Sequence, residues 1–329
     1  MKYNIEKASK ITRSALIGQA VGDALGVPVE FLSRAQVRNI GLTEMVGCDV
    51  PHTFISSWGD YIPAGAWSDD TSMAIATMAS ITDRKYLAYN DIMNRFIEWW
   101  YTGKYCSLNF PFGLGGTVNM ALANYLSNIP AIHCGPNGFK DNGNGALMRI
   151  LPFALYCIFK DYTLPATIKT IYTASSLTHG HVISKFGCLV FTVFLKELLT
   201  AASIEDAWEN TRQRSYTNCI TPDSFDAYRR LFAPDFVANA ESIIGETGYV
   251  VDTLMTAVYS MLTGHDYEST VLTAINMGYD TDTNAAVTGA LAGAYYGIDS
   301  IPDRWKDKLL KRHKLETYAD NFVKAIVRP

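Results

Sequence analysis

The sequence predicts an all-α protein that folds as a single compact domain over residues 1–329. Apolar residues recur with the 3.6-residue period of a helix along most of the chain. Alternating strand patterns are rare, and the best short candidate, residues 27–31, contains Pro28, which disfavours a strand. Neither a low-complexity linker nor an internal repeat divides the chain. One multi-helix domain is therefore the economical interpretation.

The individual helices follow from this period and from the polar or glycine-rich breaks between the periodic segments. Residues 27–66 mix glycine, proline and aromatic residues and are expected to be irregular. Residues 212–239 are the most polar stretch and are interpreted as a candidate insertion. Helices are expected over residues 11–25, 71–82, 90–101, 117–125, 146–159, 164–175, 182–199, 204–211, 250–262, 267–276, 284–296 and 302–311.

The helix expected over residues 284–296 is made almost wholly of small residues. Gly289, Gly293 and Gly297 recur at a spacing of four and therefore share one face. Because glycine costs helix stability relative to alanine, three glycines on one face predict that another backbone comes very close there. This helix is expected to lie at the centre of the fold and to hold the acidic segment ahead of it rigidly.

Two acidic clusters each stand at the head of an apolar helical run. One aspartate is enough to cap a helix and contributes about 1 kcal/mol, so each cluster holds more acid than capping requires. Oxygen ligands of this kind select Mg²⁺, Mn²⁺ or Ca²⁺, and four carboxylates match the charge of two divalent cations. Two independent over-capped helices are the structural alternative, because acidic helix starts are common. The residues concerned are Ser68, Asp69, Asp70, Asp280, Asp282 and Thr283.

Glu30 is a further candidate, because it follows an apolar segment in which an unpaired carboxylate would be costly. A buried ion pair with an arginine such as Arg34 or Arg149 is the structural interpretation. The functional interpretation is a carboxylate near the metals or an acid–base group. The sequence leaves both open.

Two polar junctions complete the set of candidates. Residues 141–149 place Asn142, Gly143, Asn144 and Gly145 ahead of a helix expected to start at Ala146, which would leave backbone N–H groups free to hold a phosphate. No strand precedes this loop, so it is neither a Walker loop nor a dinucleotide-binding fingerprint, and a simple turn is the alternative. The second junction contains His179, interpreted as a residue that hydrogen-bonds substrate or as part of a polar helix end.

The composition argues against several classes of protein. The net charge is −4 without a basic stripe, so a nucleic-acid surface is not expected. Six cysteines are scattered singly, as in a protein with free thiols in a reducing compartment. No segment resembles a signal peptide or approaches the roughly 20 apolar residues of a membrane span. We expect a cytoplasmic monomer without a membrane or nucleic-acid partner.

Taken in order, these stretches resemble the ADP-ribosylglycohydrolase family over residues 17–301. The motifs are specific in combination rather than singly. They are residues 22–26 with Glu30, residues 69–71, residues 143–149 with Pro152, residues 178–179, and residues 278–297.

The resemblance implies an all-α hydrolase with a pair of Mg²⁺ or Mn²⁺ ions. It places metal ligands at Ser68, Asp69, Asp70, Asp280, Asp282 and Thr283, and Glu30 where the family has a mobile glutamate near the metals. It places the diphosphate and ribose of ADP-ribose at Asn142, Gly143, Asn144, Gly145, Ala146 and His179. Ser68, Tyr279 and Gly180 depart from the residues usual in the family, but none of these departures removes a carboxylate.

The implied reaction is hydrolysis of the N- or O-glycosidic bond at C1″ of the distal ribose, through an oxocarbenium-like transition state. It would release ADP-ribose from a modified protein side chain, foremost arginine, or from a small ADP-ribosyl compound. Asp69, Asp70 or Asp282 would accept the proton, with Asp70 preferred, and Glu30 would shuttle protons or gate the pocket. The alternatives are an ADP-ribose-binding regulatory or immunity module without turnover, and another two-metal nucleotide hydrolase.

Overall fold

The computed structural model describes residues 3–48, 62–217 and 219–327. Within these ranges the secondary structure is helical, and the one β-type pairing is an isolated bridge between Gly143 and Tyr249. The predicted all-α class is therefore confirmed. The segment considered as a short strand contains instead a 3₁₀ turn, η1 (Val27–Val29). Residues 49–61 of the segment predicted to be irregular lie outside the described residues.

The α-helices divide into three groups along the chain. The first comprises α1 (Ile5–Gly26), α2 (Arg34–Ile40), α3 (Asp69–Arg84), α4 (Tyr89–Thr102) and α5 (Gly116–Leu126). The second comprises α6 (Leu151–Phe159), α7 (Leu164–Ser176), α8 (Val182–Leu198), α9 (Ile204–Arg212), α10 (Pro222–Phe225) and α11 (Phe236–Ile243). The third comprises α12 (Val250–Thr263), α13 (Tyr267–Ile275), α14 (Thr281–Tyr296), α15 (Asp303–Lys306) and α16 (Arg312–Ile326).

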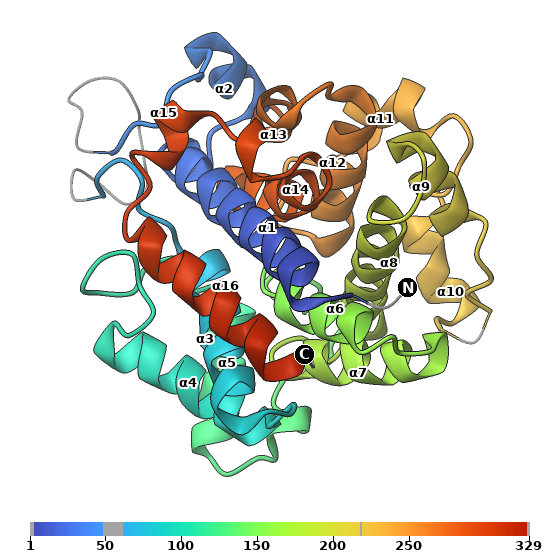
Figure 1. Ribbon diagram of the computed structural model, residues 1–329. Coiled ribbons are helices and arrows are strands. Elements are labelled where there is room, and N and C mark those ends of the chain that lie inside the picture. The colour runs from blue at the N-terminus through green and yellow to red at the C-terminus, as the bar shows by residue number, and fades with distance from the viewer. Residues whose placement is uncertain (1–2, 49–61, 218, 328–329) are drawn as a thin grey trace.

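Helices α1 and α14 lie against each other at the centre of the fold (Figure 1). A Cβ atom added at Gly18 or Gly22 would come within 2.3 or 2.0 Å of a carbonyl oxygen of α14. A Cβ atom at Gly289 or Gly293 would come within 2.3 or 2.2 Å of a carbonyl oxygen of α1. The close backbone approach predicted for these two glycines of α14 is therefore confirmed. Gly297 has a different role, because it ends the helix with φ +88° and has open space around it.

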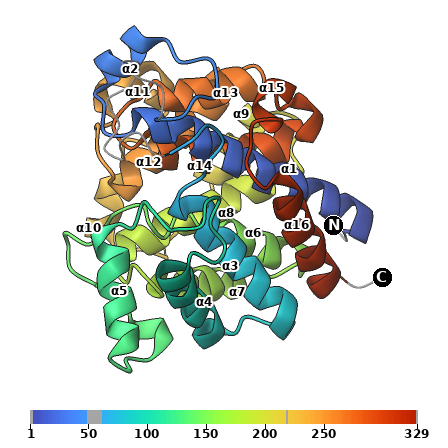
Figure 2. The same cartoon turned by 90° about the vertical axis from the view of Figure 1, so that its left-hand side faces the viewer.

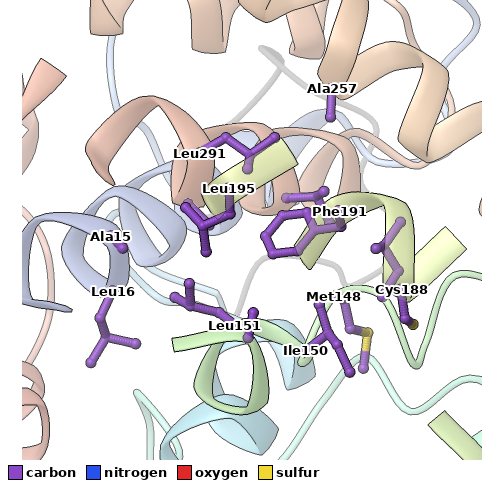
Figure 3. Packing of buried hydrophobic residues seen from close by; sticks show 14 of the residues in the cluster. Ala15, Leu16, Met148, Ile150, Leu151, Cys188, Phe191, Leu195, Ala257 and Leu291 are labelled. Carbon is purple, nitrogen blue, oxygen red and sulfur yellow. The ribbon is translucent and has the colours of Figure 1, made fainter. Parts of the chain in front are cut away.

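The remaining helices surround this central pair (Figure 2). Helix α14 packs against α12 and α13, whereas α1 packs against α16, which in turn packs against α3. Figure 3 shows side chains of α1, α6, α8 and α14 gathered in one buried cluster, among them Leu16, Leu151, Phe191 and Leu291. This cluster reaches from Tyr3 to Val327. Its continuity supports the single-domain organisation, which stays a prediction.

Three predicted helices have the wrong bounds. The helix expected over 11–25 begins six residues earlier, at Ile5. The helix expected from residue 146 begins only at Leu151, and residues 145–149 form turns. A helix begun earlier would place Pro152 in its interior, where proline lacks an N–H group and its ring clashes with the carbonyl four residues before. The helix expected over 302–311 is limited to the four residues of α15, and Lys311 has φ +50°.

Four helices fall outside the predicted set, among them the four-residue α10 within the polar stretch at 212–239. Helix α2 carries a capping box formed by Ser33 and Gln36 and ends at Gly41 with φ +63°, both of which are recognisable signals. Helix α11 overlaps the polar stretch taken as a candidate insertion. Helix α16 buries Leu315 and Phe322 on the face that packs against α1 and α3, so its apolar period is present but was not recognised.

All six cysteines are buried free thiols, as expected. Among the described residues, no single helix combines the length and apolar character needed to cross a membrane. Residues 5–29 and 34–40 meet that requirement only when taken together, although the chain bends by 100° between them.

Candidate active site

The two acidic clusters, far apart in the sequence, meet at the starts of α3 and α14. Asp23, Asp70 and Asp282 form one group in which carboxylate oxygens lie within 4.8 Å of one another. Glu30, Asp280 and Asp282 form a second group by the same measure. Asp282 belongs to both, so the two groups are continuous. Apart from Asp280, which is partly exposed, these residues are buried.

Two hydroxyls and one unpartnered oxygen define the centre of this cluster. Ser68 Oγ donates to Asp70 Oδ2 at 3.1 Å, and Thr283 Oγ1 donates to the same oxygen at 3.4 Å. The other oxygen, Asp70 Oδ1, is buried and has no hydrogen-bond partner among the described residues. An orphaned carboxylate oxygen is costly in a protein interior. Carboxylate and hydroxyl oxygens gathered in this way fit a hard divalent cation.

Asp69 lies beside this cluster rather than within either group. It lines the adjacent pocket, and a Cβ atom at Gly113 would come within 2.4 Å of its Oδ1. Gly113 has φ +91°, a conformation that glycine adopts without strain. The loop before α5 therefore approaches Asp69 closely because it carries no side chain at this position.

Burial raises the pKa of Asp69, Asp70 and Asp282 well above the ordinary value of 3.8. The neighbouring carboxylates raise these pKa values further, because each negative charge disfavours the next. Without cations, the cluster therefore favours protonated carboxyl groups. A bound divalent cation reverses this preference, because it stabilises the ionised form.

Asp23 completes the first group, although the sequence analysis assigns it no role. Its Oδ1 accepts from Ser68 N at 2.8 Å, and its Oδ2 accepts from Thr71 N at 3.1 Å and Thr71 Oγ1 at 2.7 Å. Burial raises its pKa to about 6, although these hydrogen bonds oppose the shift. Asp23 therefore fastens the start of α3 to α1. The available signal was a lone aspartate between Gly22 and Gly26 on the buried face of a helix.

The acidic start of α14 does not act as a helix cap. Asp280 occupies the N-cap position, but its side chain makes no capping hydrogen bond. Its Oδ2 accepts instead from Asn144 Nδ2 at 2.9 Å. A Cβ atom at Gly26 would come within 2.3 Å of the Asp282 backbone, so the first turn of α14 lies directly against α1. The alternative of an over-capped helix therefore does not describe α14, whereas Ser68 does cap α3.

Glu30 is buried and faces the same cluster. The guanidinium of Arg34 donates to three backbone carbonyls of the segments around α11 and α13. Arg149 donates to Ala174 O and Thr178 Oγ1. Among the residues that the structure describes, no ion pair joins Glu30 to either of these arginines. The functional interpretation of Glu30 stays a prediction.

A pocket of about 240 Å³ opens beside the carboxylates. It is lined by Glu30, Phe31, Asp69, Asp280, Asp282 and Thr283. The lining also includes Gly143, Asn144, Gly145 and His179, and Asn144 joins the two sets through its hydrogen bond to Asp280. Four of the six predicted metal ligands and four of the six predicted substrate-binding residues therefore line one cavity, whereas Ser68 and Asp70 are not part of its wall.

The glycine-asparagine loop presents free backbone donors, although it does not open a helix. Asn144 N donates to Gly248 O and Val250 N donates to Asn142 O, both at 3.0 Å, which anchors the loop to the start of α12. The N–H groups of Gly143, Gly145 and Ala146 donate to no acceptor among the described residues. Such a group of N–H donors suits an anion.

Two members of the loop do not line the pocket. The Asn142 side chain accepts from Ser184 Oγ at 3.0 Å and donates to Phe139 O at 2.9 Å. It therefore holds the loop from behind. Ala146 is also absent from the pocket wall. Direct substrate contacts by these two residues stay predictions.

His179 is held in one orientation by a chain of hydrogen bonds. Arg149 Nη2 donates to Thr178 Oγ1 at 2.5 Å, and Thr178 Oγ1 lies 3.1 Å from His179 Nδ1. Because a guanidinium has no acceptor, the threonine proton is available only to Nδ1 among these groups. When the threonine donates to Nδ1, the proton of His179 is on Nε2, which lies on the side of the ring nearest Gly143.

Burial and, to a smaller extent, the positive charge of Arg149 together lower the pKa of His179 to about 3. The imidazole is therefore neutral at physiological pH. A Cβ atom at Gly145 would come within 2.9 Å of His179 Cε1, so the loop and the ring lie in direct contact. The pocket thus presents one neutral donor beside the free N–H groups of the loop.

Comparison with known proteins agrees with this arrangement. Residues 6–329 match the profile of the ADP-ribosylglycohydrolase family. ADP-ribosylarginine hydrolase Tri1 of Serratia proteamaculans is 28% identical over 311 residues, covering 94% of this chain and 78% of the relative. ADP-ribosyl-dinitrogen reductase glycohydrolase of Rhodospirillum rubrum is 28% identical over 298 residues, covering 90% and 88%.

A solved structure of an ADP-ribosylglycohydrolase-related protein complex superposes with a TM-score of 0.74 at 28% identity. The superposition covers 97% of this chain and 99% of the other. The family profile, the relatives and the fold therefore agree over almost the whole length. The chain belongs to the ADP-ribosylglycohydrolase family, whose members are enzymes that hydrolyse glycosyl bonds.

Proposed function

We propose that this enzyme hydrolyses the bond at C1″ of the distal ribose and releases ADP-ribose from a modified arginine side chain. The observation that carries the proposal is the meeting of two carboxylate groups at Asp282, beside a pocket with free anion-binding N–H groups. The arginine linkage is supported by the Serratia relative, which is an ADP-ribosylarginine hydrolase.

Two divalent cations, Mg²⁺ or Mn²⁺, are the proposed cofactors. The unpartnered Asp70 Oδ1 and the all-oxygen donor set support this part of the proposal. When bound, the cations would orient the ribose hydroxyls and make a water molecule more acidic. The proposed ligands are Ser68, Asp69, Asp70, Asp280, Asp282 and Thr283.

The remaining roles, binding of the substrate and proton transfer, are proposed for residues of the chain. The N–H groups of the loop at 143–146 would bind the diphosphate, and His179 Nε2 would donate to an oxygen of the adjoining ribose. Asp70 would accept a proton from the attacking water as its oxygen bonds to C1″. The bond from C1″ to the guanidino nitrogen breaks, and Glu30 would return a proton to that nitrogen. The scissile bond then has one carboxylate on the side of the water and another on the side of the leaving group.

The direct test is incubation of the protein with ADP-ribosylarginine and Mg²⁺ or Mn²⁺, followed by chromatography of the products. We expect ADP-ribose and arginine, and no product in a chelator or with Asp70→Ala. Release of AMP would identify a different nucleotide hydrolase. Tight binding of ADP-ribose without turnover of any linkage would identify a binding module. We also propose a cytoplasmic location and a monomeric state. Size-exclusion chromatography tests the monomeric state.

A further inference from the structure

Two exposed aromatic rings stand at the carboxylate side of the pocket. Phe31 is 48% exposed and Tyr279 is 37% exposed. Their ring centroids lie 5.5 Å apart, and the ring planes meet at 77° in an edge-to-face arrangement. Phe31 itself lines the pocket. Single exposed apolar residues are common on protein surfaces, but these two rings contact each other beside the candidate active site.

Both aromatic residues have left-handed backbone conformations, which side chains rarely adopt. Phe31 has φ +65° and Tyr279 has φ +62°. Phe31 N donates to Tyr279 O at 2.5 Å, and Tyr279 N donates to Leu32 O at 2.7 Å. These reciprocal hydrogen bonds hold the two strained segments against each other. Strain that the surrounding structure maintains in this way is typical of functional sites.

The charges around the pair favour a cation. Phe31 directly follows Glu30, and Tyr279 directly precedes Asp280. Four carboxyl groups line the cavity and two more lie beside Asp282, so that with two divalent cations bound, ionisation of all six would leave an excess of negative charge. They belong to Asp23, Glu30, Asp69, Asp70, Asp280 and Asp282. The free N–H groups that suit an anion belong instead to the loop at residues 143–146.

We propose that the Phe31–Tyr279 pair is a subsite that stacks the planar, cationic guanidinium of ADP-ribosylated arginine. Phe31 is the contacting ring, and Tyr279 positions it through the edge-to-face contact. This inference rests on the proposed arginine linkage. A guanidinium stacks well on an aromatic face, and the attraction increases where water is excluded. A serine linkage has no cation and would gain nothing from the pair.

The test separates binding of the guanidinium from binding of ADP-ribose. Phe31→Leu keeps an apolar side chain that is unbranched at Cβ but removes the aromatic face. We expect it to raise KM for ADP-ribosylarginine about fivefold, the size of an exposed cation–π contact, with kcat little changed. The dissociation constant for ADP-ribose, measured by calorimetry, should stay the same. Phe31→Tyr keeps an aromatic face and should have the KM of the wild type. Tyr101→Leu removes a ring on α4 that is 67% exposed, and it is the matched control.

Two results would overturn the inference. One is an unchanged KM in Phe31→Leu, and the other is equal weakening of ADP-ribosylarginine and ADP-ribose, which would place the nucleotide on the ring. Tyr279→Leu should show a smaller loss than Phe31→Leu, because its effect is indirect.

Failure of the proposed function would be seen separately, as absence of turnover of ADP-ribosylarginine by the wild type. The subsite is then tested by calorimetry alone, in the wild type and in Phe31→Leu. Tighter binding of ADP-ribosylarginine than of ADP-ribose, lost in Phe31→Leu, would support the subsite. Equal binding of the two ligands by the wild type would overturn it.

Discussion

Two consecutive helices, α13 and α14, each follow an aspartate at the N-cap position, but the two aspartates have different roles. Asp266 precedes α13 and caps it, with Ser269 N donating to its Oδ1 at 2.7 Å. Asp280 precedes α14 but makes no capping bond, and its carboxylate accepts from Asn144 in a distant loop. In the next turn, Asp282 is buried among other carboxylates.

The electrostatic consequences of these two arrangements are opposite. Hydrogen bonds from Ser269 lower the pKa of the exposed Asp266, whereas burial and neighbouring charges raise the pKa of Asp282 well above its usual range. A carboxylate that stabilises its own helix is exposed and satisfied locally. One that serves a site is buried and held by segments from elsewhere in the chain. The comparison therefore separates a structural acid from a functional one.

The largest expected effect tests this separation through activity. Asp280→Ala should lower hydrolysis of ADP-ribosylarginine by about 100-fold or more, because loss of an outer-shell partner alone costs about 10–100-fold. Asp266→Ala should leave the rate unchanged. Circular dichroism would check that both variants fold. A normal rate in Asp280→Ala would abolish the distinction between the two helix starts.

The second effect concerns the contact that holds the start of α14 in place. Gly22→Ala places a Cβ atom 2.0 Å from Ala285 O, where neither backbone can withdraw without opening the contact between α1 and α14. We expect a loss of about 3 kcal/mol in the free energy of unfolding, at the upper end of the usual cost of overpacking. Denaturant titration measures it.

Gly116→Ala is the control for this substitution, because a Cβ atom there meets nothing within 4 Å. It should be neutral or gain up to about 1 kcal/mol from the better helix propensity of alanine. Equal stability of the two alanine variants would show that the central contact is looser than the structure describes.

A third effect extends the comparison to His179, which is also oriented by a distant residue. Thr178→Val removes the hydroxyl that joins Arg149 to His179 Nδ1. Loss of one buried hydrogen bond costs about 1–3 kcal/mol, so ADP-ribose should bind about tenfold more weakly by calorimetry. Thr173→Val, on the outer part of α7, should bind normally. Unchanged affinity in Thr178→Val would mean that the ring needs no such support.

The smallest expected effect is on stability as a function of pH, and it has opposite signs for the carboxyl groups at the starts of α13 and α14. In the metal-free folded protein, the buried carboxyl groups keep their protons above pH 3.8, where the unfolded chain has already lost its own. The free energy of unfolding therefore falls as the pH rises from 3.8 through about 6, which is the pKa of Asp23 in the folded protein. Asp266 has a lowered pKa, so its contribution is lost as pH falls.

Melting temperatures in chelator between pH 4 and pH 8 would measure both trends. Asp70→Asn should flatten the decline at high pH, and Asp266→Asn should affect only the acidic end. A melting temperature that rises steadily to pH 8 in the metal-free wild type would contradict the assignment of raised pKa values to this cluster.

The features predicted correctly from the sequence are those with a local cause. The glycines at 289 and 293 imply a close backbone wherever their helix lies, and surplus acid at a helix start is visible without the fold. Asp23 was missed because its role arises only when α1 packs against the start of α3. The strained conformations of Phe31 and Tyr279 depend on hydrogen bonds between segments more than two hundred residues apart, which no local pattern contains.

The central claim is that the carboxylates joined at Asp282 hold two divalent cations. Titration calorimetry with Mn²⁺ on chelator-treated protein tests it most directly. We predict two ions bound per chain, with release of protons from the buried carboxyls as the ions bind, and fewer ions in Asp282→Asn but not in Asp266→Asn. Absence of Mn²⁺ and Mg²⁺ binding, together with undiminished hydrolysis in the presence of chelator, would contradict the claim.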